Sequence, residues 1–210
     1  MALDEVLVRA RTCENVLRFY HWADGPAVTF GYAQFVSQVR GETAARGFTG
    51  DICRRPTGGG VVYHTDDLTF SLIFSSQDRP GEIYEKLHGS IQAALVLCGV
   101  TARVFDQKLP AAAYAPSQQH RASTCFTNPV ENDLLLPNGQ KMLGGAIRRF
   151  DNRILYQGSL QVPGARTQAA YRQAVINGVR RFLDTHLQPQ AAPAAWIEAA
   201  HSLAQTQYRT

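Results

Sequence analysis

The chain contains the stretch Arg54-Arg55-Pro56-Thr57-Gly58-Gly59-Gly60-Val61-Val62-Tyr63-His64, in which three consecutive glycines lie between two strand-like runs. Glycine has no Cβ, so a triplet lets successive N–H groups turn toward a ligand and approach it closely, and we expect positive φ at Gly59. Arg54 and Arg55 add fixed positive charge, which suits a carboxylate or a phosphate. The stretch predicts a ligand site, although a hairpin turn with solvated arginines would leave the same pattern.

A second informative stretch starts at Asn132-Asp133-Leu134-Leu135-Leu136 and continues as Gly139-Gln140-Lys141-Met142-Leu143-Gly144-Gly145-Ala146-Ile147-Arg148-Arg149. It sets one lysine, Lys141, in a predicted strand and follows it with small residues. The segment Tyr156-Gln157-Gly158-Ser159-Leu160 comes next, and the intervening pair Asp151-Asn152 tolerates the positive φ of a tight hairpin. The hairpin would place Lys141 and Gln157 on adjacent strands, with the glycine loop and Lys141 facing one groove.

The remaining periodicities alternate between strand and helix. They predict an α/β fold built on a mixed, largely antiparallel sheet flanked by helices. No linker-like stretch divides the chain, so residues 1–210 are expected to form one domain, with the helices of 165–210 packing on it and no separate accessory domain. Cys98 falls in the apolar stripe of a helix and is expected to be inert packing. The predicted strands are 16–22, 27–32, 52–55, 61–64, 68–74, 141–150 and 153–162, and the predicted helices are 1–10, 80–98, one capped by Thr167 and one starting at Pro193.

Composition excludes several classes of protein. Hydrophobic residues make up 45% and charged residues 18% of the 210 residues, which is ordinary for a soluble protein. The net charge of +4 comes without a basic run, so it fits an acidic partner or an acyl or phosphate ligand better than nucleic acid. No apolar run reaches the length of a membrane span, and the N-terminus lacks the charged region followed by an apolar one that marks a leader. A cytoplasmic location is therefore expected. The four cysteines show no metal-binding spacing, so no structural metal is expected.

The order and approximate spacing of these blocks, with Met1-Ala2-Leu3-Asp4-Glu5 upstream, resemble the lipoate–protein ligase and octanoyltransferase family from about residue 1 to 162. The resemblance implies a biotin/lipoate ligase-like catalytic domain that attaches an octanoyl or lipoyl group to the lysine of a lipoyl carrier domain. Relatives usually have a strand before the first helix, whereas this chain starts inside that helix.

The resemblance also implies roles for individual residues. Lys141 matches a lysine that contacts the acyl carbonyl and phosphate oxygens, where a fixed ammonium stabilises negative charge on the attacked carbonyl. Asn132 and Asp133 match residues near an adenylate, and Gln157, next to Gly158, stands where many members have histidine, which puts an acid–base role there in doubt. Gly144, Gly145 and Ala146 would leave room for backbone approach. The acyl pocket itself would be lined by Arg55, Thr57, Gly58, Gly59, Gly60 and His64, with Arg54 beside it.

Each of these residues also has a purely structural interpretation. His64 could hold the end of a strand by hydrogen bonding, and Asp133 could be a turn aspartate. Lys141 could be a partly exposed strand lysine that contributes little to packing. Arg148 and Arg149 are interpreted as a solvated pair rather than as ligand contacts.

Cys125 distinguishes two mechanisms. The segment Ser123-Thr124-Cys125-Phe126-Thr127-Asn128-Pro129 resembles the loop that carries the acyl-accepting cysteine in one branch of octanoyltransferases. In that branch octanoate passes from acyl carrier protein to the thiol as a thioester and then to the carrier lysine, with no ATP. A thiolate near Lys141 would have a lowered pKa and could act as the nucleophile. Transfer through Cys125 is the first choice.

Three alternatives stay open. The first is an ATP-dependent lipoate–protein ligase that uses ATP and Mg²⁺ and works through lipoyl-AMP. Gly60 favours it because several transferases of the thioester branch place arginine there, while the absence of an accessory domain points the other way. Biotin–protein ligase is disfavoured because its arginine-rich glycine motif has no counterpart here. A scaffold that only binds lipoate would require Lys141 to have no chemical role.

Overall fold

The computed structural model describes residues 1–10, 15–22, 25–108 and 129–208. Its strands form two sheets. The larger sheet has six antiparallel strands in the order β1 (Val16–Phe19), β5 (Leu68–Ser75), β9 (Arg153–Leu160), β8 (Lys141–Phe150), β7 (Leu134–Leu135) and β6 (Arg103–Val104). The smaller sheet pairs β2 (Ala27–Phe30) in parallel with β3 (Asp51–Arg54) and antiparallel with β4 (Val62–His64).

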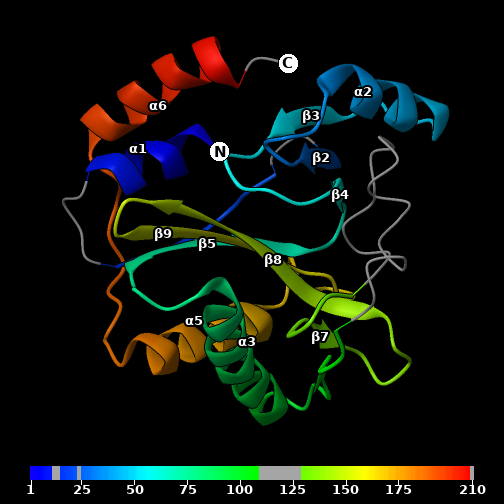
Figure 1. Cartoon of the computed structure of the whole chain (residues 1–210), viewed down its shortest axis with the longest axis vertical. Coiled ribbons are helices and arrows are strands. Elements are labelled where there is room, and N and C mark those ends of the chain that lie inside the picture. The colour runs from blue at the N-terminus through cyan, green and yellow to red at the C-terminus, as the bar shows by residue number, and fades with distance from the viewer. Residues whose placement is uncertain (11–14, 23–24, 109–128, 209–210) are drawn as a thin grey trace.

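The predicted α/β class with a largely antiparallel sheet flanked by helices is confirmed. Figure 1 shows α3 (Pro80–Leu97) and α5 (Ala169–Leu183) on one face of the large sheet, and α1 (Ala2–Ala10) and α6 (Ala194–Gln207) on the other. The small sheet and α2 (Val36–Ala45) lie on the same side as α1. The division into two sheets was not predictable from periodicity, which reports alternation along a strand but not the strand's partners.

Strand β5 shows how the two faces of the large sheet differ. Its apolar positions Phe70, Leu72 and Phe74 pack in the main core with α3 and α5. The intervening positions Thr69 and Ser71 are equally buried, because they face the layer formed by α1 and the small sheet rather than water. The alternation of apolar and polar residues therefore marks a strand with a dry core on one face and a buried polar layer on the other.

The hairpin predicted at Asp151-Asn152 is confirmed. Asp151 has a φ of 55°, and β8 and β9 pair on either side of it. The register sets Gly145 opposite Gly158 and Ala146 opposite Gln157, so small residues and one amide lie side by side in the middle of the sheet.

Several local predictions were wrong or incomplete. Helix α2 was not predicted, because it buries only Val39 and Thr43 and so leaves no apolar stripe in the sequence. The residue before α5 is Gln168, not Thr167, and no side chain caps that helix end. Cys98 is exposed at the end of α3 rather than packed in its stripe. In the described part of the chain, no helix has the length and apolar character needed to cross a membrane.

Candidate active site

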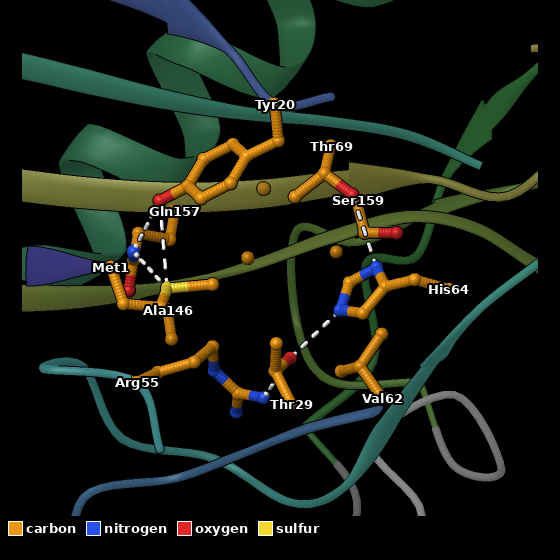
Figure 2. A pocket seen from close by; sticks show the side chains of 13 residues that line it. Met1, Tyr20, Thr29, Arg55, Val62, His64, Thr69, Ala146, Gln157 and Ser159 are labelled. Atoms are coloured by element: carbon orange, nitrogen blue, oxygen red, sulfur yellow. Dashed lines mark hydrogen bonds between the residues drawn. The ribbon is translucent and has the colours of Figure 1, made fainter. Parts of the chain in front are cut away.

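A cavity lies between the two sheets (Figure 2). Its floor is formed by neighbouring residues of β8 and β9, and its opposite wall by residues of β2 and β4 together with Arg55, which follows β3. Tyr20, Thr69 and Met1 complete the lining. The floor residues are Gly144, Gly145, Ala146, Gln157, Gly158 and Ser159, and the wall residues of β2 and β4 are Thr29, Val62 and His64.

The structure brings together about half of the residues singled out in the sequence. Seven of them line the cavity: Arg55, His64, Gly144, Gly145, Ala146, Gln157 and Gly158. Lys141, Asp133 and Thr57 contact lining residues without lining the cavity themselves. Arg54, Asn132 and the three loop glycines do not contribute to the lining. Cys125 lies outside the described residues, so its position relative to the cavity stays a prediction.

The two arginines before the glycine loop have different roles. The buried Arg55 donates from Nη1 to Thr29 Oγ1 at 2.9 Å and from Nη2 to the carbonyl oxygens of Gly58 and Gly60 at 2.9 and 2.8 Å. Arg55 therefore holds the backbone of the glycine loop through two of its carbonyl oxygens. Arg54 instead donates to the carbonyl oxygens of Tyr32 and Gln34, so its charge does not reach the cavity.

The glycine loop needs glycine for backbone reasons. The predicted positive φ is confirmed at Gly59, where it is 89°. The loop also passes close to the end of β2, because a Cβ on Gly31 would lie 2.0 Å from the Gly59 carbonyl oxygen. An L side chain at Gly59 would adopt a strained backbone conformation, and one at Gly31 would collide with the backbone of the loop.

Lys141 is buried, contrary to the expectation of a partly exposed strand lysine. Its Nζ lies 2.7 Å from Asp133 Oδ2, and each side chain is no more than 3% exposed. Burial raises the pKa of Asp133, although the Lys141 ammonium and the Val130 N–H oppose this by favouring the carboxylate. Asp133 is therefore the counter-ion of Lys141 as well as a turn residue.

The glycines of the floor leave room for side chains of the protein itself. A Cβ on Gly144 would lie 2.2 Å from Lys141 Cε and 2.6 Å from Nζ, so the lysine ends over this glycine at the edge of the cavity. A Cβ on Gly145 or Gly158 would fall within 2.7 Å of the Tyr156 ring. The expected room for backbone approach at Gly144, Gly145 and Ala146 stays a prediction, and all three residues line the cavity.

Gln157, on the floor of the cavity, is hydrogen bonded to three side chains from other parts of the chain. Its Oε1 accepts a 2.7 Å hydrogen bond from Thr57, and its Nε2 donates to Asp4 and to Tyr20 at 2.8 and 2.7 Å. Burial alone would raise the pKa of Asp4, but the Arg18 guanidinium at 2.6 Å holds that pKa below its ordinary value. A neutral amide accepts no proton at ordinary pH, so Gln157 orients neighbouring groups rather than acting as an acid or base.

The sequence interpretation of a solvated pair holds for Arg149, which is exposed, but not for Arg148, which is half-buried. Arg148 donates to the Pro56 carbonyl oxygen at 2.9 Å and lies over the Tyr32 ring at 4.6 Å. Arg149 donates to the carbonyl oxygens of Ser76 and Asp78 at 2.6 and 2.8 Å. Arg148 therefore links the large sheet to the glycine loop.

The family model described as the lipoyl protein ligase A/B catalytic domain matches residues 1–186. The chain belongs to this family. The octanoyltransferase LipM of Symbiobacterium thermophilum is 32% identical to it over 167 residues, which cover 76% of this chain and 59% of that relative. The chain thus spans about three-fifths of that relative's length.

Solved structures agree with the lipoyl protein ligase fold. A protein of T. acidophilum with bound lipoic acid superposes with a TM-score of 0.77 at 20% identity, covering 100% of this chain and 89% of that one. Lipoate-protein ligase A bound with ATP superposes with a TM-score of 0.73 at 21% identity, covering 100% and 90%. At this level of identity the likeness establishes the fold.

The packing over Gly144 makes a first prediction for this family member. In Gly144→Ala the new methyl group would displace the flexible end of Lys141 from Asp133, because no backbone stands in the way. If the chain catalyses acyl transfer, we expect the rate to fall about 10²-fold, which is the lower range for losing one positioned oxyanion donor, while the fold persists. Gly41→Ala is the control, since a Cβ there has nothing within 4 Å. Equal activity in the two variants would show that the position of Lys141 is unimportant.

Beneath the floor lies a buried histidine, His88, which we expect to make the stability of the protein depend on pH. His88 is hydrogen bonded through Nδ1 to the Asn132 carbonyl oxygen at 2.6 Å and through Nε2 to Tyr156 Oη at 2.8 Å. Burial lowers the pKa of His88 from 6.5 to about 4. As pH falls below 6.5 the unfolded state takes up the proton first, so stability is lost between pH 6.5 and 4 and no further below that.

The expected loss is ~3 kcal/mol in the free energy of unfolding across that window. Urea unfolding at several pH values measures it. His88→Gln should remove the slope, whereas the exposed His201→Gln should keep it. The buried carboxylates Asp4 and Asp67 have lowered pKa values, so their protonation reduces the free energy of unfolding only at lower pH. A wild-type stability that is flat from pH 6.5 to 4 would contradict the assignment.

A group of polar residues around the cavity was not predicted from the sequence. Tyr20, Thr29, Thr69 and Ser159 line the cavity, and Asp67 lies buried behind them. The only signal in the sequence was the polar half of the strand alternation in β5, β9 and β2. Such residues are indistinguishable from solvent-facing ones until a second layer is known to cover them.

Proposed function

We propose that this chain transfers an octanoyl group from acyl carrier protein, through a thioester on Cys125, to the lysine of a lipoyl carrier domain. The observation that carries the proposal is the Lys141 ammonium, buried against Asp133 at the edge of a cavity between two sheets. The LipM octanoyltransferase relative, at 32% identity, supports the reaction class. The coarser activity, attachment of an octanoyl or lipoyl group to protein, is common to both proposals made here.

The proposed reaction has two balanced steps. The Cys125 thiolate attacks the thioester carbonyl of octanoyl–acyl carrier protein, a new C–S bond forms, the C–S bond to the carrier breaks, and the carrier departs as its thiolate. The carrier-domain lysine then attacks the Cys125 thioester as the free amine, an amide bond forms, the C–S bond to Cys125 breaks, and the proton lost by the amine passes to solvent as the Cys125 thiolate is released. In both steps negative charge develops on the carbonyl oxygen, and a positioned Lys141 ammonium would stabilise it.

The walls of the cavity suit the acyl chain. Val62, Ala146 and the floor glycines offer apolar surface, and Arg55 sets the glycine loop beside them. We propose that the chain lies between the sheets with its carbonyl end toward Gly144 and Lys141. The helices of 165–210 would belong to the same catalytic unit, since α5 packs on α3 and α6 on α1.

The second candidate is the ATP-dependent ligase that forms lipoyl-AMP, and the intact triplet with Gly60 favours it. ATP would supply activation of the carboxylate, and Mg²⁺ would accompany its phosphates. Among the described residues, no group of three or more histidine, cysteine, aspartate or glutamate side chains gathers to hold a metal, and Asp133 is already paired with Lys141. The described side chains therefore do not form a metal site by themselves.

Intact-protein mass spectrometry separates the two candidates. The enzyme is incubated with octanoyl–acyl carrier protein without ATP, and separately with lipoic acid, ATP and Mg²⁺ in the presence of a lipoyl domain. An octanoyl adduct on Cys125 in the first incubation supports the transferase. Labelling of the lipoyl domain only in the second supports the ligase, and labelling in neither refutes both.

A further inference from the structure

A continuous chain of buried hydrogen bonds runs along the wall of the cavity, from the glycine loop to Asp67. Figure 2 shows its middle part, from Arg55 through Thr29 to His64. Arg55 Nη1 lies 2.9 Å from Thr29 Oγ1, which lies 2.8 Å from His64 Nε2. His64 Nδ1 lies 2.8 Å from Asp67 Oδ2. Thr29 is fully buried, and His64 and Asp67 are 2 and 3% exposed, so water does not compete for these bonds.

The chemistry of the groups fixes the direction of this chain. An ionised carboxylate only accepts, so His64 Nδ1 carries the ring proton and donates it to Asp67 Oδ2. In the neutral imidazole Nε2 is then bare and accepts from Thr29 Oγ1, while a lone pair of the same oxygen accepts from Arg55. The carboxylate of Asp67 is thus the final acceptor.

Two further hydroxyl groups donate to Asp67, the residue at which this chain of hydrogen bonds ends. Thr69 Oγ1 accepts from the Trp22 indole N–H at 3.0 Å and donates to Asp67 Oδ2 at 2.7 Å. Ser159 donates to the same oxygen at 2.6 Å. Burial alone would raise the pKa of Asp67, but these donors, His64 foremost, hold it below its ordinary value, so the carboxylate stays ionised.

We propose that Thr29 is a positioning residue. Asp67 fixes the His64 ring, His64 fixes the direction of the Thr29 hydroxyl, and that hydroxyl holds the Arg55 guanidinium in place. Arg55 in turn holds the glycine loop in its binding conformation. A hydroxyl at this place can accept from the guanidinium and donate to the imidazole at once, whereas an aliphatic side chain of the same size can do neither. Arg55 then has both ends of its guanidinium fixed, one on Thr29 and the other on the carbonyl oxygens of Gly58 and Gly60. The effect on acyl binding rests on the proposed function, whereas the effect on the loop does not.

Thr29→Val tests the proposal, because valine keeps the shape and removes the hydroxyl. Thr29→Ser should restore the chain. Thr43→Val is the matched control, since Thr43 is 1% exposed and its hydroxyl bonds only to carbonyl oxygens within α2. Amide hydrogen exchange of residues 56–61 reports the loop, and titration calorimetry with octanoic and lipoic acids reports the site. KM and kcat are measured with octanoyl–acyl carrier protein.

We expect amide exchange in 56–61 to rise in Thr29→Val alone, with acid affinity about tenfold weaker and KM about tenfold higher at nearly constant kcat. Thr29→Ser and Thr43→Val should match the wild type in each measurement. Unchanged exchange in Thr29→Val, or equal changes in Thr43→Val, would overturn the proposal. If the wild type neither binds the acids nor transfers octanoate, the proposed function fails, and the exchange result still decides the role of Thr29.

A measurement on the wild type covers the case in which Thr29→Val does not fold. Nitrogen-15 NMR of the His64 ring distinguishes a protonated Nδ1 with a bare Nε2 from the opposite tautomer. The proposal requires the first. Finding the proton on Nε2 would reverse the direction of the chain and disconnect Arg55 from Asp67.

Discussion

Replacing Lys141 by alanine is expected to lower acyl transfer about 10²- to 10³-fold by either proposed mechanism, because the ammonium is the positioned cation closest to the reacting carbonyl in our proposal. Steady-state transfer to a lipoyl domain measures the loss. The same substitution leaves the Asp133 carboxylate buried without its 2.7 Å partner. Breaking such a pair from one side destabilises proteins by about 3–5 kcal/mol, so the variant should also be less stable.

A double variant separates these two effects. Lys141→Met with Asp133→Asn fills the lysine's volume and removes the unpaired charge, while the asparagine oxygen can still accept from the Val130 N–H. We expect it to recover most of the stability and none of the activity. Near-wild-type turnover in the stable double variant would remove Lys141 from the mechanism.

The second large effect concerns Cys125. If the thioester is obligatory, Cys125→Ala removes the nucleophile and transfer from octanoyl–acyl carrier protein should fall to background. Cys125→Ser should be nearly as damaging, because a hydroxyl is not ionised at neutral pH as an activated thiol is. Gel-shift or mass detection of the octanoylated lipoyl domain measures both variants, and the exposed Cys98→Ala serves as the control.

The ligase candidate makes the opposite prediction. Both Cys125 variants should then keep ATP-dependent attachment of lipoate within a few-fold, because the carboxylate is activated by AMP rather than by the thiol. Robust ATP-dependent activity in Cys125→Ala, together with no ATP-independent transfer by the wild type, would replace our first proposal by the second.

The elements of the fold were largely predictable because their signals are local. The alternation in Leu68–Ser75 and the Asp151-Asn152 turn each depend on neighbouring residues. Helix α2 and the separation into two sheets could not be predicted in the same way. Both depend on which surface covers which, and that information is spread over distant parts of the chain.

The candidate site was predictable in Arg55, His64 and the residues of its floor but not in its polar wall. The glycine triplet and Lys141 stand out because their residue types are unusual in a strand context. Thr29, Thr69 and Ser159 are ordinary strand residues in the sequence. In the structure Thr69 and Ser159 donate to the buried Asp67, and Thr29 is connected to Asp67 through His64. The burial of Lys141 was also unpredictable, because it requires knowing that Asp133 lies across from it and that Gly144 leaves the space.

The placement of the cavity between two separate sheets has a consequence for how this enzyme family can change its substrates. In the described part of the chain, no strand pairing joins the sheets, and side-chain bonds such as Thr57 to Gln157 and Arg148 to Pro56 cross the gap. The distance between the two sheets is therefore set by side-chain contacts and not by hydrogen bonds between strands. Directed evolution toward bulkier or branched acyl groups should begin at the residues that make these contacts, because changing them can alter the width of the cavity without breaking the strand pairing of either sheet.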